Sequence, residues 1–288
     1  MTVSTRRYAS FAIIGVLLLV ATMIAGCGQK GKENPAESKD TKTSVSGKIT
    51  VAGSTSVQPF SDILAEEFTK KNPQAEINVQ GGGSSEGITA AISGAADIGS
   101  SSRELKPEEA NQGLKEYKIA LDGVAIVVHP SNKVNELKID DIKNIYLGNV
   151  TNWKELGGDS AAITVVCREE GSGTRGAFED IVMNKEKISD KVIIQSSTGA
   201  VRSTVAGDKN AIGFVSLASV DNSVKGLKVN GAAPSAENVK NGTYMISRPF
   251  LYLTKGEAQG LSKAFIDYIL SPEGQDILEQ EGAIRIDK

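Results

Sequence analysis

Short apolar runs alternate with stretches whose apolar side chains recur at helical spacing, beginning at Lys48. Apolar runs of about four to eight residues are typical of buried strands, and apolar positions three and four apart are typical of amphipathic helices. Strands that alternate with helices indicate an α/β architecture with mostly parallel sheets. The pattern predicts strands at residues 48–51, 76–79, 96–99, 124–128, 163–167, 192–194, 212–215 and 245–253, and helices at 57–68, from 88 to Gly94, 139–147, 176–183, 201–206 and 261–269.

These units fall into two groups along the chain. The first group occupies about 75 residues and the second about 120, whereas the C-terminal remainder is too short to fold alone. We therefore expect a discontinuous first lobe, residues 47–123 plus 245–288, and a second lobe, residues 124–244. Two crossings between the lobes, near Gly123 and Tyr244, would leave a ligand cleft that closes by a hinge motion.

The N-terminal residues are typical of a targeting segment. Within residues 1–26, Arg6 and Arg7 precede an uncharged stretch at residues 8–26. This arrangement is typical of a signal peptide. An uncleaved transmembrane anchor is the alternative, because the stretch approaches the roughly 20 residues that span a bilayer. The residues before Cys27 are small and resemble the lipobox of bacterial lipoproteins, so we favour cleavage and a lipidated, palmitate-bearing Cys27. Residues 27–46 contain almost nothing apolar, which predicts a disordered tether.

The overall charge argues against nucleic acid as a partner. The 288 residues include 32 basic and 35 acidic side chains, and removal of Arg6 and Arg7 with the signal peptide leaves 30 against 35, a net charge of −5. A protein that binds nucleic acid needs a basic surface to neutralise phosphates. A protein of this charge that binds an anion needs a local source of attraction, which helix N-termini and one buried arginine can supply.

Cysteine usage excludes two further classes of site. Cys167 is the only cysteine besides Cys27, so the sequence predicts neither a disulfide nor a metal cluster, and no cofactor is expected. Cys167 ends an apolar run, which favours a small buried side chain over a reactive thiol.

Three strand-to-helix junctions carry loops of glycine, serine and threonine. They lie at residues 53–56, 81–85 and 171–174, the last shortly after Arg168. A helix N-terminus presents unpaired N–H groups and a partial positive charge, so three such ends that meet would make an anion site. The glycines allow close backbone approach, and Arg168 can offer a planar fork to two oxygens of a tetrahedral anion.

The hydroxyl side chains in these loops exceed what helix capping requires. We expect Thr55 and Ser56, and likewise Ser84 and Ser85, at the N-cap positions of their helices. A capped helix needs one such residue, and the carboxyl edge of an open α/β sheet is where ligands bind. The surplus of donors therefore favours a binding site.

Two enzyme classes match these loops poorly. No Gly-Lys-Ser/Thr follows at the spacing of a nucleotide-binding phosphate loop. Residues 83–87 match the Gly-x-Ser-x-Gly nucleophile elbow of serine hydrolases. The only histidine, however, is His129, which lies at a strand end and soon after the elbow rather than late in the chain. A serine hydrolase stays a distant alternative, and we assign no catalytic residue.

Six separated segments, each weak alone, are specific in their order and spacing. They are GSTS at 53–56, QGGGSS at 80–85, DIGSSSR at 97–103, TNW at 151–153, REEGSGT at 168–174 and AIGFVS at 211–216. From about Lys48 onward the chain therefore resembles the substrate-binding lipoproteins of high-affinity phosphate ABC transporters. The resemblance implies a two-lobed periplasmic-binding-protein-like (type II) fold that binds inorganic phosphate in its cleft without chemistry. It also implies a monomer, lipid-anchored at the extracytoplasmic face of the bacterial cell membrane, that delivers phosphate to ABC permease subunits.

The resemblance further implies, by position, which residues contact the ligand. Some members have an aspartate that accepts the proton of hydrogen phosphate where this chain has Ser102. Discrimination from sulfate would then rest on Ser102, on a nearby acid such as Glu104, or on other geometry, so sulfate, molybdate and tungstate stay open as ligands. We also expect Glu170 to orient Arg168, or to be a solvated acid, and Trp153 to fix a loop. The implied ligand contacts are Thr55, Ser56, Ser84, Ser102, Arg168, Ser172, Gly173 and Thr174.

Overall fold

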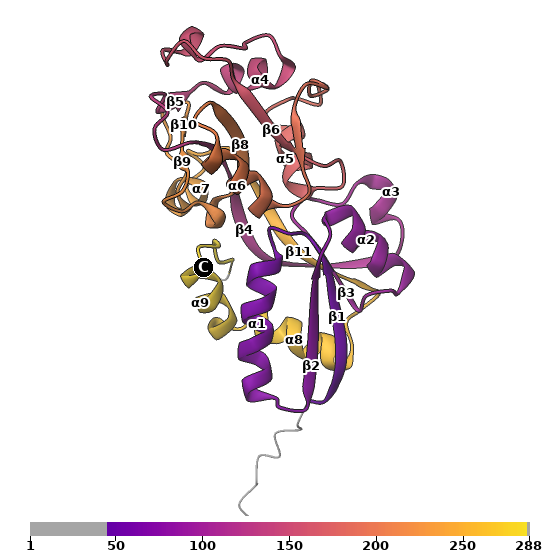
Figure 1. Cartoon of the computed structure of the whole chain (residues 1–288). Helices are drawn as coiled ribbons and strands as arrows, with labels where there is room; N and C mark the ends of the chain where they lie inside the picture. The colour runs from indigo at the N-terminus through magenta and orange to yellow at the C-terminus, as the bar shows by residue number, and fades with distance from the viewer. Residues whose placement is uncertain (1–44, 287–288) are drawn as a thin grey trace, which may run out of the picture. The chain divides into compact units, whose positions relative to one another are not determined.

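The computed structural model describes residues 45–286, in which strands and helices alternate as predicted (Figure 1). The expected signal peptide at 1–26, the lipidated Cys27 and the tether up to residue 44 lie outside the described residues. The chain begins with β1 (Gly47–Gly53), α1 (Gln58–Lys71), β2 (Ala75–Gly81), α2 (Ser84–Ser93), β3 (Ile98–Ser101), α3 (Pro107–Ala110) and the long strand β4 (Leu114–Val128). It continues with β5 (Glu136–Leu137), α4 (Ile139–Leu147), the 3₁₀ helix η1 (Trp153–Leu156), β6 (Thr164–Arg168), α5 (Gly173–Ile181), β7 (Ile193–Gln195), α6 (Thr198–Gly207) and β8 (Ala211–Ser216). The last elements are η2 (Leu217–Ser219), β9 (Lys225–Gly226), β10 (Lys228–Val229), α7 (Ala236–Lys240), β11 (Ser247–Lys255), α8 (Gly260–Leu270) and α9 (Pro272–Gln280).

A nine-stranded sheet connects the two groups of elements. Its order is β2-β1-β3-β11-β4-β8-β6-β7, with β9 beside β4. Strands β1, β2 and β3 are parallel to one another, and so are β8, β6 and β7, whereas β4 and β11 run antiparallel to their neighbours. At the end of β1, Gly53 is opposite Gly81 and Ser100, and at the end of β6, Arg168 is opposite Gln195. Each parallel group therefore ends in register, which gathers the following loops at one edge.

Several element boundaries differ from the sequence prediction. Helices α2 and α5 begin at Ser84 and Gly173, earlier than the predicted 88 and 176, because their first turns consist of small and charged residues without apolar spacing. Strand β3 lies at Ile98–Ser101 rather than 96–99, so two serines assigned to a loop belong to the strand. Helix α9 was not predicted; the Ser271 hydroxyl caps it by accepting a hydrogen bond from the Gly274 N–H.

Strand β4 is much longer than the apolar run at 124–128 suggested. Its first half, from Leu114 to Gly123, alternates apolar side chains with lysine, glutamate and aspartate. Pairing with β11 along this half supplies the hydrogen bonds that hold it extended. Figure 1 shows β4 and β11 side by side, with β4 continuing to β8.

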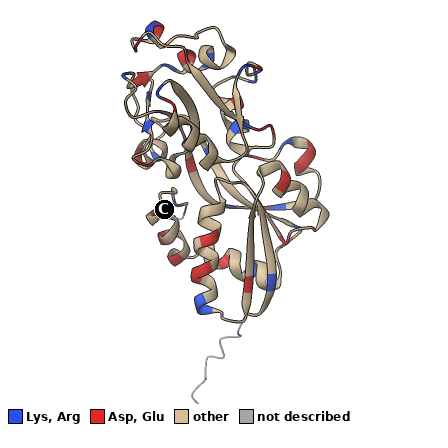
Figure 2. Cartoon of the chain, viewed as in Figure 1, with Lys and Arg blue, Asp and Glu red and all other residues tan. Residues whose placement is uncertain are grey.

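Charges of both signs are mixed along the chain. Figure 2 shows lysine and arginine interspersed with aspartate and glutamate over both groups of elements. Among the described residues no helix is both long and apolar enough to serve as a membrane span.

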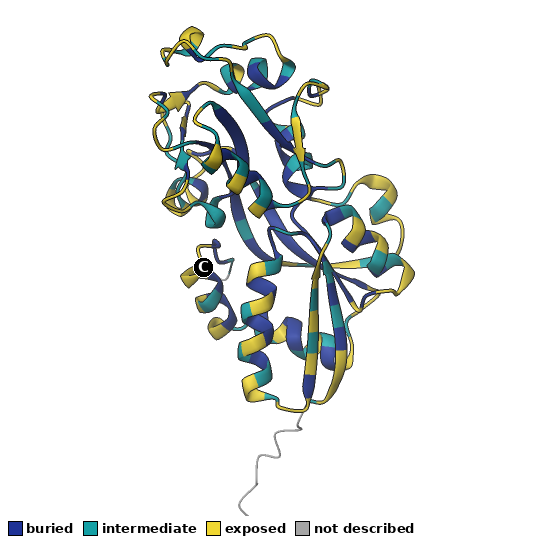
Figure 3. Ribbon diagram, viewed as in Figure 1, coloured by how far each residue is buried: buried dark blue, intermediate teal, exposed yellow. Residues whose placement is uncertain are grey.

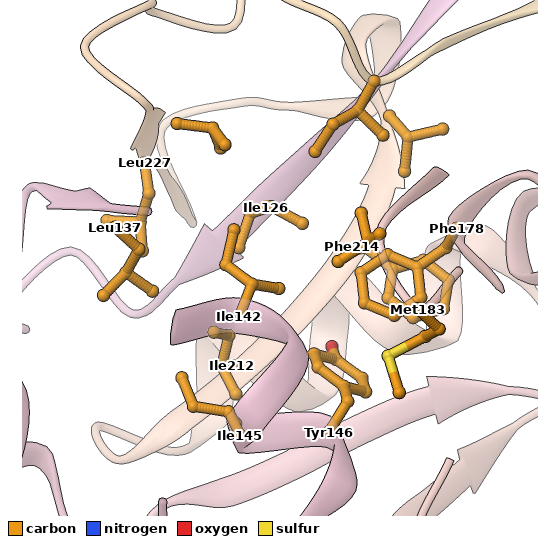
Figure 4. Packing of buried hydrophobic residues seen from close by; sticks show 14 of the residues in the cluster. Ile126, Leu137, Ile142, Ile145, Tyr146, Phe178, Met183, Ile212, Phe214 and Leu227 are labelled. Atoms are coloured by element: carbon orange, nitrogen blue, oxygen red, sulfur yellow. The ribbon is translucent and has the colours of Figure 1, made fainter. Parts of the chain in front are cut away.

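Two large apolar clusters form the cores. One contains Phe60, Leu64 and Phe68 of α1 with Phe250 and Phe265. The other contains Tyr146, Phe178 and Phe214, and Phe178 stacks on Phe214 with ring centroids 4.2 Å apart (Figure 4). Strand β4 contributes side chains to both clusters, and Figure 3 shows it buried where it leads from one to the other. The expected residue limits of the lobes stay a prediction.

The C-terminal segment also spans both clusters. Ile284 pairs with Leu121 of β4 through two backbone hydrogen bonds of 2.8 and 2.9 Å. Its side chain packs into the cluster of Tyr146 and Phe178, whereas the preceding α9 packs its Leu278 into the cluster of Phe60. The buried Gln275 side chain of α9 donates to the Ile119 carbonyl at 2.9 Å, which holds the segment against β4.

Candidate functional site

The predicted site residues gather where the loops after β1, β2, β3 and β6 meet. Their separation along the chain reaches more than a hundred residues, as between Ser56 and Thr174. Thr55 is partly exposed and Gly173 is buried. The other six predicted contacts are each at most 1% exposed, namely Ser56, Ser84, Ser102, Arg168, Ser172 and Thr174.

Hydroxyl groups join α1 to helices α5 and α6. The Ser56 Oγ lies 2.9 Å from the Thr174 Oγ1 and 2.8 Å from the Thr198 Oγ1. The Thr55 Oγ1 accepts a hydrogen bond of 3.3 Å from the Thr198 N–H. These contacts bring the first strand–helix unit of the chain against units from its second half.

A second set of hydroxyl groups joins the ends of β1 and β3 to the start of α2. The Ser54 hydroxyl donates to the Ser102 Oγ at 2.9 Å, and the Ser102 N–H donates to the Ser84 Oγ at 3.0 Å. The Ser84 and Ser102 hydroxyls are 3.4 Å apart. Gly173 of α5 packs directly on this pair, because a Cβ built there would lie 2.2 Å from the Ser84 Oγ and 2.7 Å from the Ser102 Oγ.

Arg168 is oriented by the residue that follows it. Its Nε and Nη2 donate to the two carboxylate oxygens of Glu169 at 2.8 and 2.7 Å, and its Nη1 donates to the Thr198 Oγ1 at 3.0 Å. The expectation that Glu170 performs this role is wrong; Glu169 pairs side-on because it lies on the edge of the guanidinium that carries Nε. A guanidinium has five N–H donors, so two remain for a ligand.

Helices α1 and α2 begin without a side-chain cap. The N-cap residues are Val57 and Gly83, and no side chain accepts a hydrogen bond from the first turn of either helix. The expectation of N-caps at Thr55 or Ser56 and at Ser84 or Ser85 is therefore wrong, because the hydroxyls bond to one another instead. Ser172 does cap α5, accepting the Arg175 N–H at 3.2 Å. Only part of each uncapped start is open to an anion, because Pro59 has no N–H and the Gln58 and Ser85 N–H groups donate to the Ser54 and Gly171 carbonyls.

The sequence prediction missed Thr198. It opens α6, is 2% exposed, and contacts Ser56, Thr55 and Arg168. A signal was present, because residues 196–199 read Ser-Ser-Thr-Gly between a strand and a helix, like the three loops that were singled out. This fourth junction completes the cluster of hydroxyls around Arg168.

A buried ion pair beside Ser102 was also missed. Asp122 of β4 and Arg248 of β11 are 1% and 3% exposed, and they face each other across the antiparallel pair with an Nη2–Oδ2 distance of 2.9 Å. Burial raises the pKa of Asp122, against the opposing effects of Arg248 and of hydrogen bonds from Ser216 and the Leu217 N–H. Burial likewise lowers the pKa of Arg248, and the positive charge of Arg168 adds to that shift.

Arg103 and Glu109 close one side of the cluster. The Arg103 guanidinium binds both carboxylate oxygens of Glu109 at 2.7 and 2.8 Å and the Ser85 hydroxyl at 3.1 Å. A Cβ built on Gly176 of α5 would lie 3.1 Å from the Arg103 Cδ, so the two elements touch. The Ser85 N–H donates to the Gly171 carbonyl nearby at 3.0 Å.

Removal of the Glu109 charge should reduce the loss of unfolding free energy that occurs as the pH falls. Burial raises the pKa of Glu109, but hydrogen bonds from Arg103 and the Lys106 N–H outweigh it and hold the pKa below the ordinary 4.5. A carboxyl whose pKa is lower in the folded state adds stability above its unfolded pKa, and this stability is lost as pH falls through the folded pKa. Glu109→Gln should therefore cost about 1–3 kcal/mol near neutral pH and less in acid. Urea unfolding across a pH series measures this.

The exposed Glu108 on the same helix provides the control. Glu108→Gln should leave the pH series unchanged, because its side chain makes none of the contacts of Glu109. Parallel stability curves for Glu109→Gln and the wild type would contradict the prediction.

The remaining singled-out residues lie outside the cluster. The Nδ1 of His129 contacts the Ser131 hydroxyl at 2.8 Å, so the ring occupies a strand end and does not serve Ser84 or Ser85. Burial raises the pKa of the Cys167 thiol to about 11, which keeps it protonated and unreactive. Trp153 is buried and donates to the Asn210 carbonyl at 2.9 Å, as expected of a residue that fixes a loop. The Glu104 side chain is exposed, and its charge adds to burial in raising the pKa of Glu116.

Comparison with known proteins identifies the family. A model of the PBP superfamily domain matches residues 38–273. The phosphate-binding protein PstS of Bacillus subtilis is 34% identical over 282 residues, which cover 95% of this chain and 94% of the relative. The chain belongs to the PstS family of phosphate-binding proteins.

Solved structures agree with membership of the PstS family. A phosphate ABC transporter substrate-binding protein from Clostridium perfringens, solved with bound phosphate, superposes with a TM-score of 0.82 and 46% identity, covering 84% of this chain and all of that one. An ABC-type phosphate transport receptor from Vibrio cholerae gives a TM-score of 0.71 with 37% identity, covering 83% of this chain and 100% of the other. The two-lobed α/β fold expected from the sequence is confirmed.

Proposed function

We propose that the chain captures inorganic phosphate by closing around it and delivers it to an ABC permease. The observation that carries the proposal is the buried cluster of hydroxyls around Arg168, at the starts of four helices, of which α1 and α2 have no side-chain cap. Six hydroxyls there have mainly one another as partners, and an anion would supply the acceptor that such a group of donors lacks. They belong to Ser54, Ser56, Ser84, Ser102, Thr174 and Thr198. The names of the relatives favour phosphate among the tetrahedral anions.

The energetics suit a small dianion. Each hydrogen bond to a charged group contributes about 1.5–3 kcal/mol, so several that converge on one anion can offset its dehydration. Arg168 is paired with Glu169 and Arg248 with Asp122, so the formal charges of these four side chains cancel. The attraction therefore comes from oriented donors and helix N-termini rather than from a surplus of positive charge.

The ligand contacts in this proposal include every residue expected from the sequence. The proposal keeps the lobe limits 47–123 plus 245–288 and 124–244. The buried members of the two apolar clusters support these limits except for Ile246 and Ile284, which pack into the cluster of Tyr146 and Phe178. Thr198 joins the contacts as an addition from the structure. The contacts expected from the sequence, to which Thr198 is added, are Thr55, Ser56, Ser84, Ser102, Arg168, Ser172, Gly173 and Thr174.

The cellular setting follows from the same proposal. We propose a monomer without enzymatic activity, held by lipid on Cys27 at the extracytoplasmic face of the membrane. Cys27 lies outside the described residues, so this part rests on the sequence before it. Mass spectrometry of the membrane-extracted protein tests it: a diacylglyceryl N-terminal cysteine is expected, and a chain that retains residues 1–26 would overturn it.

Isothermal titration of the full chain tests the ligand. We expect phosphate to bind more tightly than sulfate, molybdate or tungstate, because its more basic oxygens accept stronger hydrogen bonds. If one of the other three anions binds more tightly, the location of the anion site still stands, but the protein belongs to the transport system for that anion. Absence of heat with all four anions would overturn the proposed function.

A further inference from the structure

We propose that Arg248, held by Asp122, is a positioning residue that fixes Ser102 as a hydrogen-bond donor, so that the site reads ionised oxygens and does not detect a proton on the ligand. This inference rests on the proposed function and concerns the selectivity of that same site. A site of this kind would discriminate between phosphate and sulfate by only a modest margin, because it does not recognise the proton in which the two anions differ.

The acceptor capacity of the Ser102 hydroxyl is already filled. A hydroxyl offers one proton and two lone pairs. The Ser54 hydroxyl donates to the Ser102 Oγ at 2.9 Å, and Arg248 Nη1 donates to the same atom at 3.2 Å. With both lone pairs engaged, Ser102 can only give its proton away.

No strong acceptor in the protein competes with a ligand oxygen for the Ser102 proton. The nearest hydroxyl acceptor is the Ser84 Oγ at 3.4 Å, a long contact, and that atom already accepts the Ser102 N–H at 3.0 Å. Arg248 Nη1 also donates to the Ser102 carbonyl at 3.2 Å, which fixes the backbone beside the hydroxyl. A ligand oxygen that approached Ser102 would therefore meet a donor.

Asp122, the only fully buried carboxylate among residues 45–286, cannot accept a ligand proton either. Asp122 Oδ2 receives Nε and Nη2 of Arg248 at 3.2 and 2.9 Å, and Oδ1 receives the Ser216 hydroxyl at 2.8 Å. Its role is to neutralise Arg248, since an unpaired buried arginine would be costly. Glu104, the other acid considered from the sequence, is exposed. The Glu169 carboxylate near Arg168 is engaged as well, because each of its oxygens accepts a hydrogen bond from that guanidinium.

The ratio of sulfate to phosphate dissociation constants tests the inference, because a general loss of structure would weaken both anions alike. The double variant Asp122→Asn with Arg248→Gln removes both charges and keeps hydrogen-bonding groups. It frees a lone pair on Ser102 that can accept the phosphate proton, which sulfate cannot offer. The ratio should rise between about threefold and tenfold, the factor expected for one hydrogen bond.

Ser54→Ala provides a second variant that leaves the ion pair intact. It removes the other donor to Ser102, so the ratio should rise in the same direction even if the double variant does not fold. The matched control is Asp221→Asn with Arg202→Gln, an ion pair whose side chains are 50% and 36% exposed, and it should leave the ratio unchanged.

Two outcomes would overturn the inference. One is a ratio that stays the same in both test variants, which would assign Arg248 a structural role only. The other is a wild type that binds phosphate tightly and shows no heat with millimolar sulfate, which would mean that the site detects the ligand proton while the proposed function stands. A wild type that binds neither anion would remove the proposed function, and this inference with it.

Discussion

Arg168→Ala should weaken phosphate binding by roughly 2–5 kcal/mol, about 30-fold to several thousand-fold in Kd. Arg168 is 1% exposed and holds Glu169 through two hydrogen bonds and Thr198 through a third. Its removal takes two ligand-directed donors away and leaves the Glu169 carboxylate without its partner beside the anion. Isothermal titration with phosphate measures the loss, and chemical unfolding of the ligand-free protein shows how much of it is structural.

A second arginine gives the matched control for this prediction. Arg202 also forms an ion pair, with Asp221 at 3.2 Å, but its side chain is 36% exposed. Arg202→Ala should therefore bind phosphate as the wild type does. A loss of less than a few-fold in Arg168→Ala would remove Arg168 from the site, whatever the control shows.

Gly173→Ala should also weaken binding, by about fivefold to 150-fold. A Cβ at this position would lie 2.2 Å from the Ser84 Oγ, 2.7 Å from the Ser102 Oγ and 3.0 Å from the Ser102 carbonyl carbon. The two hydroxyls cannot move aside freely, because hydrogen bonds hold them, and overpacking of this kind costs about 1–3 kcal/mol. The clash arises only when α5 approaches the ends of β3 and α2, so it opposes closure rather than folding.

Two measurements separate closure from folding in this variant. Titration should show the loss of affinity, whereas the unfolding free energy of the ligand-free protein should change by less. Gly199→Ala is the matched control, because a Cβ at Gly199 meets nothing within 4 Å although the residue follows Thr198 in the same cluster. Wild-type affinity in Gly173→Ala would show that the binding state does not have the loop contacts described.

The gathering of the hydroxyl residues into one cluster was largely predictable from three loops, because strand-to-helix junctions are local features. Parallel strands end at a common edge, so glycines and hydroxyls that follow them must meet. Thr198 could have been found by the same argument, since its loop has the same composition. The cap positions were harder to predict from the sequence, because the hydroxyls of Thr55 and Ser56 bond to partners far along the chain instead of capping their own helix.

The ion pair beside Ser102 could not be predicted from local pattern. Asp122 and Arg248 are 126 positions apart, and each resembles an ordinary surface charge in a strand of mixed composition. Only the antiparallel register of β4 with β11 places them opposite each other and buries both. The choice between Glu169 and Glu170 as the partner of Arg168 likewise depends on loop geometry that spacing leaves open.

Because the C-terminal segment is attached to β4, the end of the described chain should respond when the two apolar clusters move relative to each other. Ile284 is hydrogen-bonded to Leu121 and buried in one apolar cluster, while the helix before it is packed into the other. A rotation of one cluster against the other must therefore alter the surroundings of this short segment. A fluorescent dye coupled beside it would turn the protein into a reagentless optical sensor for its anion, with the dye far from the binding chemistry along the chain.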